Sequence, residues 1–220
     1  MSIDAIVKNP QGEADAVVIW LHGLGDSGAG FSEAVPALRL NADHRIKFIF
    51  PNAPEQPVTI NNGFVMRSWY DIKTMDLDGR ADIPTLEQSE QLIIELIEEQ
   101  IANGISSDRI VLTGFSQGGV LSLYTALRLK HKLAGVVALS CYLATNDLPF
   151  EGAQGANNDT PIFSAHGEQD SVVPFAAGKD AAQRLSAANF DVTWSQYPME
   201  HSVCIEQLSD LGRWLTERLA

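Results

Sequence analysis

The sequence predicts an α/β fold in which helices cover both faces of a mostly parallel sheet. Short runs of β-branched and other apolar residues alternate with longer helical patterns, which is typical of β-α-β units. The predicted strands are almost continuously apolar, as expected for strands that are buried on both faces. Hydrophobic residues make up 45% of the 220 residues, and no repeat or linker divides them. A single domain over residues 1–220 is therefore expected.

Six apolar runs are predicted to form the centre of this sheet. They are rich in valine and isoleucine, which favour strands, as in the runs AVVIWL and RIVLT. A weaker strand, expected to be antiparallel, is predicted within residues 3–7. The six central strands are predicted at residues 16–21, 47–50, 109–113, 135–140, 161–165 and 192–197.

The clearest helix is predicted over residues 86–102. An apolar stripe at helical spacing runs through it, Thr85 with Gln88 resembles a capping box, and Gly104 follows as a stop signal. The polar, glycine-rich stretch 151–159 is predicted to be a surface loop. Further helices are predicted at residues 31–40, 117–130, 175–189 and 203–219.

The charge and cysteine content exclude several classes of protein. With 28 acidic and 15 basic residues the formal net charge is −13, so the protein repels phosphate backbones and anionic lipids. Neither nucleic-acid binding nor stable membrane anchoring is expected. Two isolated thiols, Cys141 and Cys204, suit a reducing compartment. No signal-peptide pattern or bilayer-spanning run is recognised, so a cytoplasmic protein is predicted.

The segment from Gly114 to Gly118 reads GFSQG and matches the G-x-S-x-G pattern of a nucleophile elbow. A strand-like run leads directly into this segment and a helical pattern leads out of it. In such a turn the serine is strained and its hydroxyl is raised above the sheet, and glycine is required on both sides to avoid a clash. We therefore predict that Ser116 is the nucleophile of an α/β-hydrolase. A glycine-rich helix start with only a structural role is the alternative.

A serine nucleophile requires a base, and the base requires an acid to orient it. His201 follows the last predicted strand and precedes the last helix, which places it at the C-terminal edge of the sheet. Asp170 ends the loop after the preceding strand, at the same edge. Because the chain order in this fold is serine, acid, histidine, Ser116, Asp170 and His201 are predicted to form a catalytic triad. His166 as the base and Glu168 as the acid are the alternatives.

The negative charge that develops during attack on a carbonyl requires preorganised hydrogen-bond donors. The backbone N–H groups of Leu24 and Gln117 are predicted to supply them. Gln117 directly follows the nucleophile, and glycines beside Leu24 let the backbone approach a substrate closely. His22 and Asp26 are expected to brace this loop through hydrogen bonds. The alternative is that the HGLGD segment is only a tight turn between a strand and a helix.

Six segments, taken together, resemble the phospholipase/carboxylesterase family, which includes bacterial carboxylesterases and acyl-protein thioesterases. The resemblance extends in order over essentially the whole chain. The segments read LHGLGDSGAGF (21–31), PNAPEQPVTINNG (51–63), SWYDI (68–72), GFSQGG (114–119), HGEQDSVVP (166–174) and YPMEHSVCIEQLSDLGRWL (197–215). At Glu200 the sequence departs from the family, where many relatives are expected to carry a small residue.

The resemblance implies a compact α/β-hydrolase without a large cap domain. It also implies hydrolysis of esters or thioesters without a cofactor, and it allows for a homodimer. The family's nucleophile, acid and base fall on Ser116, Asp170 and His201, and its oxyanion donors fall on Leu24 and Gln117. These are the same residues that the sequence patterns select.

The predicted function is that of a serine hydrolase which cleaves a small-molecule ester or an acylated substrate through an acyl-enzyme. No metal is expected, because no histidine pair has metal-ligand spacing. A carboxylesterase for short to medium acyl groups is favoured. The alternatives are an acyl-protein thioesterase or lysophospholipase and, in a different class, a non-catalytic binding module. Residues 61–84 are expected to bind the acyl group, with contacts from Trp69, Met66 and Met75.

Overall fold

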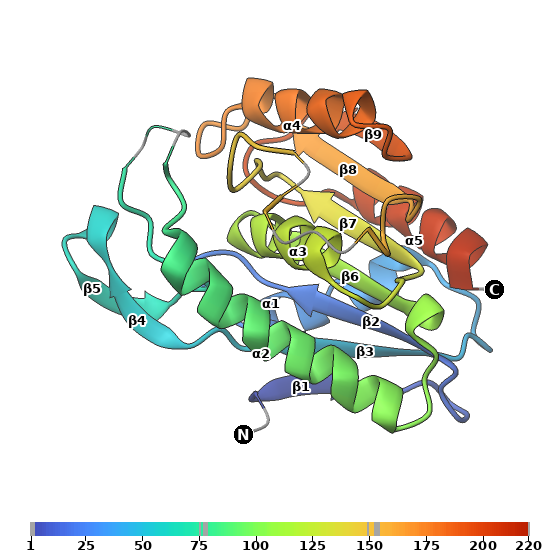
Figure 1. The fold of residues 1–220 in the computed structure, drawn as a ribbon. Helices are drawn as coiled ribbons and strands as arrows, with labels where there is room; N and C mark the ends of the chain where they lie inside the picture. Colours follow the sequence, from blue (N-terminus) through green and yellow to red (C-terminus); the bar gives the residue numbers. More distant parts are fainter. Residues whose placement is uncertain (1–2, 75, 77–78, 149, 152–154, 220) are drawn as a thin grey trace.

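The computed structural model describes residues 3–74, 76, 79–148, 150–151 and 155–219. Within them, seven strands form the main sheet in the order β1-β3-β2-β6-β7-β8-β9 (Figure 1). β1 is antiparallel to β3 and all other neighbours are parallel, which confirms the predicted sheet. The strands are β1 (Ala5–Lys8), β2 (Ala16–Leu21), β3 (Ile46–Pro51), β6 (Ile110–Phe115), β7 (Gly135–Leu139), β8 (Ile162–Gly167) and β9 (Val192–Tyr197).

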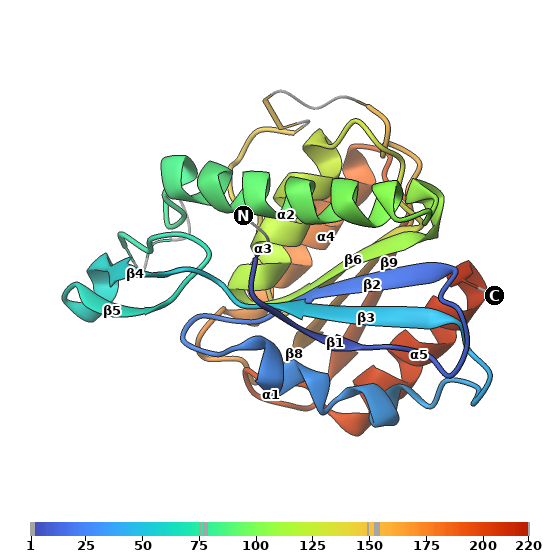
Figure 2. The ribbon, with the colours of Figure 1, turned by 90° about the horizontal axis from the view of Figure 1, so that it is seen from below.

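Helices cover both faces of this sheet, as predicted (Figure 2). One face carries α2 (Ile83–Ala102), α3 (Gln117–Arg128) and α4 (Phe175–Ala187). The other carries α1 (Gly28–Ser32) and α5 (Ile205–Leu219). No large cap domain lies over the sheet in the described part of the chain. None of the helices described combines the length and the apolarity needed to cross a bilayer.

The central strand β2 shows why the sheet needs cover on both sides. All six of its residues are fully buried. Because side chains alternate along a strand, Val17 and Ile19 pack in the core beneath α2, α3 and α4. Val18 and Trp20 pack in the second core, against α1 and α5.

The helix predicted over residues 31–40 is wrong. α1 ends at Ser32, and a 3-10 helix follows at Val35–Leu38. Pro36 explains the break, because it has no N–H to donate and its ring disfavours the α conformation of the preceding residue. Arg39 then turns the chain with a left-handed φ of 53°.

The predicted start of the helix at residue 86 is also wrong, and so is the capping box between Thr85 and Gln88. α2 begins at Ile83, and its N-cap is Asp82, whose side chain accepts a hydrogen bond from the Thr85 amide. Pro84 lies in the first turn, where its missing N–H would have no helical partner in any case.

A small hairpin that the sequence analysis did not predict projects from the main sheet beside α2 (Figure 1). It consists of β4 (Glu55–Val58) and β5 (Phe64–Arg67), which pair antiparallel. Prolines and polar residues in this stretch indicate a loop. The proline in β4 is tolerated because one edge of each strand in a two-stranded sheet is unpaired.

Candidate active site

The carboxyl ends of β2, β6, β8 and β9 meet at one edge of the main sheet (Figure 1). Residues from the loops that follow these strands line one cavity. Ligands of open α/β sheets bind at this edge. The cavity has a volume of about 320 Å³. It is lined by Gly23, Leu24, Asp26, Tyr70, Ile72, Arg80, Phe115, Ser116, Gln117, Tyr142, Val172, Val173 and His201.

Ser116 lies at the turn between β6 and α3 and has a φ of 54° and a ψ of −118°. L-residues rarely adopt this conformation, so the surrounding structure must impose it. A Cβ atom on Gly114 would lie 2.1 Å from the Gly118 carbonyl oxygen, and one on Gly118 would lie 2.4 Å from the Leu21 carbonyl oxygen. The glycines on both sides of the serine are therefore required, as the sequence pattern predicted.

His201 and Asp170 form a continuous hydrogen-bonded chain with Ser116. Nε2 of His201 lies 2.9 Å from Oγ of Ser116, and Nδ1 lies 2.7 Å from Oδ2 of Asp170. With its Nδ1–H donated to the carboxylate, the neutral imidazole presents an Nε2 lone pair to the serine hydroxyl. The Phe115 ring packs on the imidazole, with 4.8 Å between the ring centroids. The structure thus brings the three predicted residues together.

The Asp170 side chain is held by its own loop. Its Oδ1 accepts hydrogen bonds from the amides of Val172 and Val173, each at 2.9 Å. Oδ2 remains available to His201, so the acid can orient only one tautomer of the base. Glu168, the alternative acid, is exposed and accepts a hydrogen bond from Gln196 instead.

His166, the alternative base, lies in β8 and is fully buried. Its Nε2–H donates to the Val173 carbonyl at 2.9 Å, and the same atom lies 3.3 Å from Oδ2 of Asp170. Burial lowers the pKa of His166, so the ring is neutral at physiological pH. Because His166 contacts the acid and His201 contacts Ser116, the geometry favours His201 as the base.

Leu24 and Gln117, the predicted oxyanion donors, both line the cavity. Gln117 is the first residue of α3, so its amide has no partner inside the helix, and the helix dipole favours negative charge there. Among the described residues, the Leu24 amide donates no backbone hydrogen bond. Both amides are therefore free to bind a developing oxyanion.

The side chain of Gln117 has a role that the sequence analysis missed. It is buried, and its Oε1 accepts a hydrogen bond from the Trp69 amide at 2.8 Å. Its Nε2 donates to Ser68 Oγ at 2.9 Å and to the Tyr70 carbonyl at 2.5 Å. The Trp69 indole N–H in turn donates to the His22 carbonyl at 2.9 Å. Hydrogen bonds therefore connect the start of α3, residues 68–70 and the loop after β2.

His22 and Asp26 brace the loop after β2, as expected. His22 accepts a hydrogen bond from the Ala53 amide at Nε2, and its Nδ1 lies 2.7 Å from the Gly23 carbonyl. Burial lowers the pKa of His22, which fits this neutral, fully bonded ring. Asp26 accepts a hydrogen bond from the Ser27 amide at 2.7 Å.

The predicted substrate contacts differ from the side chains that line the cavity. Trp69 is fully buried and is not part of the cavity wall, because its indole is bonded inside the core. Met66 is half-buried and also lies outside the wall. Met75 lies outside the described residues. The predicted segment 61–84 does contribute to the wall, but through Tyr70, Ile72 and Arg80, and Tyr142 joins them from outside that segment.

Cys141 follows β7 near the cavity but is not part of its wall. The thiol is buried, and this burial raises its pKa to about 12. A thiol with such a pKa is not a nucleophile at neutral pH. Cys141 is therefore a small packing residue.

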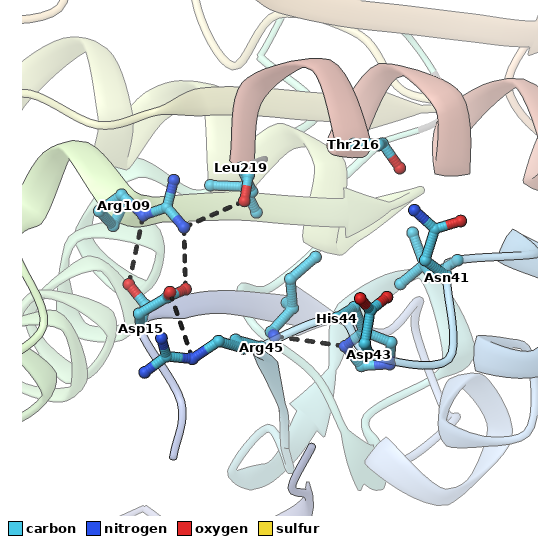
Figure 3. Close-up of a pocket in the computed structure, with 10 residues that line it drawn as sticks. Asp15, Asn41, Asp43, His44, Arg45, Arg109, Thr216 and Leu219 are labelled. Carbon is cyan, nitrogen blue, oxygen red and sulfur yellow. Dashed lines mark hydrogen bonds and ion pairs between the residues drawn. The ribbon is translucent and has the colours of Figure 1, made fainter. Parts of the chain in front are cut away.

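A second cavity, of about 220 Å³, lies where the amino ends of β2, β3 and β6 meet the end of α5 (Figure 3). Three of its charged side chains, Asp15, Arg45 and Arg109, form ion pairs with one another. Nη2 of Arg109 donates to Oδ1 of Asp15 at 2.8 Å, and Nε of Arg45 lies 3.4 Å from Oδ2 of the same carboxylate. The residues that line this cavity include no hydrogen-bonded serine, histidine and aspartate like Ser116, His201 and Asp170. Across the described part of the chain, no group of three or more His, Cys, Asp or Glu side chains is arranged to hold a metal ion.

Comparison with known proteins gives a consistent result over nearly the whole chain. The family model described as Phospholipase/Carboxylesterase matches residues 3–218. The chain is 42% identical over 214 residues to acyl-protein thioesterase 1 of Yarrowia lipolytica, covering 93% of this chain and 92% of the relative. It is 41% identical over 216 residues to acyl-protein thioesterase 1 of Neurospora crassa, covering 93% of this chain and 87% of the relative.

Solved structures agree with this result. The crystal structure of Zea mays acyl-protein thioesterase 2 superposes with a TM-score of 0.86 and 28% sequence identity, and the match covers 99% of each chain. The predicted α/β-hydrolase fold is thereby confirmed.

Proposed function

The chain belongs to the phospholipase/carboxylesterase family of serine hydrolases, and from this premise we propose that it is a thioesterase that removes acyl groups from acylated proteins. The relay from Ser116 through His201 to Asp170, with contacts of 2.9 and 2.7 Å, is the observation that carries the proposal. The relatives in Yarrowia and Neurospora are both named acyl-protein thioesterases, which supports this function over the carboxylesterase favoured from the sequence.

In the proposed reaction, Ser116 is the nucleophile and His201 is the general base. His201 accepts the serine proton as Oγ attacks the acyl carbon, and then donates it to the departing thiolate or alkoxide. Water, activated by the same imidazole, then hydrolyses the acyl-enzyme. Asp170 fixes the tautomer of His201 and stabilises the imidazolium that forms.

The amides of Leu24 and Gln117 stabilise the oxyanion in this proposal. Both belong to the cavity wall, and the second also lies at the amino end of α3. Donors that are already oriented need no reorganisation when charge develops, which is why such sites contribute strongly to catalysis.

A carboxylesterase acting on short to medium acyl groups is the second candidate. The cavity of about 320 Å³ supports it, because ligand pockets range from about 300 to 1,000 Å³ and this one is at the small end. A series of p-nitrophenyl esters of increasing chain length, run beside an S-palmitoylated peptide, separates the two functions. The thioesterase proposal expects turnover of the peptide and preference for long chains, whereas activity confined to short esters would favour the carboxylesterase.

Covalent labelling with a fluorophosphonate tests the shared chemistry. The wild-type protein should be labelled, and the Ser116→Ala variant should not be. The substitution should lower kcat by on the order of 10⁴-fold or more with the circular dichroism spectrum unchanged. A wild-type protein that remains unlabelled would instead favour the non-catalytic binding module.

A further inference from the structure

Arg80 is a buried charge in the wall of the active-site cavity, and no carboxylate among the described residues pairs with it. Only 5% of the residue is exposed. Burying a charge without a counter-ion is strongly unfavourable, so a charge that is buried in this way is expected to have a function. The buried acidic residues of the described part, by contrast, each contact a basic side chain: Asp82 contacts Lys73, Glu90 contacts Arg128, and Asp170 contacts His201.

The contacts that Arg80 does make leave most of its hydrogen-bonding capacity unused. Nη1 and Nη2 both lie 3.4 Å from a single acceptor, the Val172 carbonyl, which is long for a hydrogen bond. Nε is buried and has no partner among the described residues. The guanidinium also lies over the Tyr142 ring, 5.4 Å from its centroid. This cation–π contact offsets part of the desolvation but satisfies none of the five N–H donors.

The backbone holds Arg80 in place. Its carbonyl accepts a hydrogen bond from the Lys73 amide at 3.3 Å, and the next residue, Ala81, pairs with Ile72 in an antiparallel bridge. Asp82 then caps α2. Because these contacts fix the backbone of Arg80 and of the two residues after it, a ligand that binds the guanidinium does not have to order this part of the chain first.

Two tyrosine hydroxyl groups provide further hydrogen-bond donors in the same cavity. The hydroxyl groups of Tyr70 and Tyr142 are buried and lie 2.9 Å apart. Only one of their two hydrogens is used between them, and the other has no hydrogen-bond acceptor among the described residues. Burial raises the pKa of Tyr142 to about 12, so its hydroxyl remains protonated, and able to donate, at neutral pH.

We propose that Arg80, together with the hydroxyl pair of Tyr70 and Tyr142, binds an anionic group of the substrate, a carboxylate or a phosphate. The planar guanidinium is suited to both groups because it can donate two parallel hydrogen bonds to their oxygens. This inference rests on the proposed hydrolase function and narrows its substrates to esters or thioesters that carry a negative charge near the scissile bond.

Other charged residues in the two cavities are consistent with this role for Arg80. Arg45 and Arg109, in the cavity of Figure 3, share the carboxylate of Asp15 and so already have a counter-ion. Asp26, the acidic residue in the wall of the active-site cavity, is exposed and bonded to an amide. Water and salt screen its charge, so its repulsion of an anionic substrate is weak compared with the attraction of a buried guanidinium.

The experiment measures kcat/KM for matched anionic and neutral esters. One pair carries the charge on the acyl group, with mono-p-nitrophenyl adipate against p-nitrophenyl heptanoate. The other carries it on the leaving group, with butyryl glycerol phosphate against butyrylglycerol. We expect the wild-type protein to prefer the anionic member in one pair, which also identifies the half of the substrate that Arg80 binds. In Arg80→Met the anionic-to-neutral ratio should fall roughly 10- to 100-fold, and Arg80→Lys should retain part of it.

Arg213→Met is the matched control. It removes the same charge from α5, where the side chain is 74% exposed and paired with Asp210, and it should leave the ratio unchanged. A wild-type preference for the neutral ester in both pairs would overturn the inference. So would an Arg80→Met variant with a lower Tm and an unchanged ratio, the behaviour of a purely structural brace. Neither result affects the proposed hydrolase function, which fails only if labelling and turnover of every ester are both absent.

Discussion

The two oxygens of Asp170 have separate tasks, and a residue with only one acceptor could perform only one of them. Oδ1 is bound by the amides of Val172 and Val173, and Oδ2 faces Nδ1 of His201. In Asp170→Asn the remaining oxygen would keep the two amides, and the new NH₂ group would face His201. Nδ1 would then have to accept, and the hydrogen would move to Nε2, which could no longer take a proton from Ser116.

We therefore expect Asp170→Asn to lower kcat by on the order of 10⁴-fold while leaving the fold intact, as for a triad held in the wrong tautomer. Stopped or continuous assays with a p-nitrophenyl ester measure the change, and circular dichroism checks the fold. Asp159→Asn is the control, because Asp159 is exposed and its carboxylate pairs with Lys132 on the surface. A loss of less than about tenfold would contradict the assigned role of Asp170.

Sequence patterns identified some residues of the cavity and missed others for physical reasons. Ser116, Asp170 and His201 each follow a strand that could be recognised by its apolar run, so their meeting at one edge could be predicted. Arg80 and Tyr142 reach the cavity through irregular loops, where no periodicity indicates the direction of a side chain. That Arg80 has no carboxylate partner, and that one hydroxyl hydrogen of the tyrosine pair has no acceptor, can be recognised only when the neighbouring residues in the structure are known.

At the scale of elements, the side chain of Gln117 joins the start of α3 to residues 68–70, so a change there should disturb both. Gln117→Met keeps the volume and the backbone amide but leaves the buried Trp69 amide without its acceptor. We expect the free energy of unfolding to fall by about 1–3 kcal/mol. We also expect kcat to fall by about tenfold, because a displaced loop misaligns the oxyanion donors.

Urea denaturation measures the first effect of Gln117→Met, and the ester assay measures the second. Gln207→Met is a matched control, because Gln207 is also buried but both polar atoms of its side chain have no partner among the described residues. Removing an unsatisfied polar group should be neutral or stabilising. If the two variants had equal stabilities, the hydrogen bonds of Gln117 would have no special role.

The errors in predicted elements occur where a local signal competes with tertiary structure. The apolar run after residue 31 resembles a helix, but Pro36 breaks it into two short pieces. In α2, Thr85 resembles an N-cap, yet Asp82 takes that position and Thr85 bonds to it. The β4–β5 hairpin depends on a turn in which Asn62 and Gly63 both have positive φ, and the prolines nearby conceal its strands. The central strands lacked such competition and were predicted to within two residues.

At the scale of the whole molecule, two fully buried histidines link stability to pH. His22, directly after β2, and His166, in β8, are both completely buried, and burial lowers the pKa of both. In the unfolded chain a histidine takes up a proton below about pH 6.5, its ordinary pKa. The native state therefore binds fewer protons than the unfolded state below this pH, and stability must rise with increasing pH there.

We accordingly expect the contribution of the two histidines to the free energy of unfolding to be greatest above about pH 6.5. Below this pH the free energy of unfolding should fall by up to about 1.4 kcal/mol per pH unit for each histidine. Urea denaturation at about pH 7.5 and about pH 5.5 measures the difference, with an unchanged m-value showing that the same surface is exposed. Most carboxyl groups titrate below this range, so the slope reports mainly the histidines. Replacing His166 with Asn should reduce this slope, since one of the two proton-binding differences is removed. If the free energy of unfolding were the same at both pH values, these histidines would be able to take up protons while the protein stays folded. The assignment of both rings as neutral in the folded protein would then be wrong.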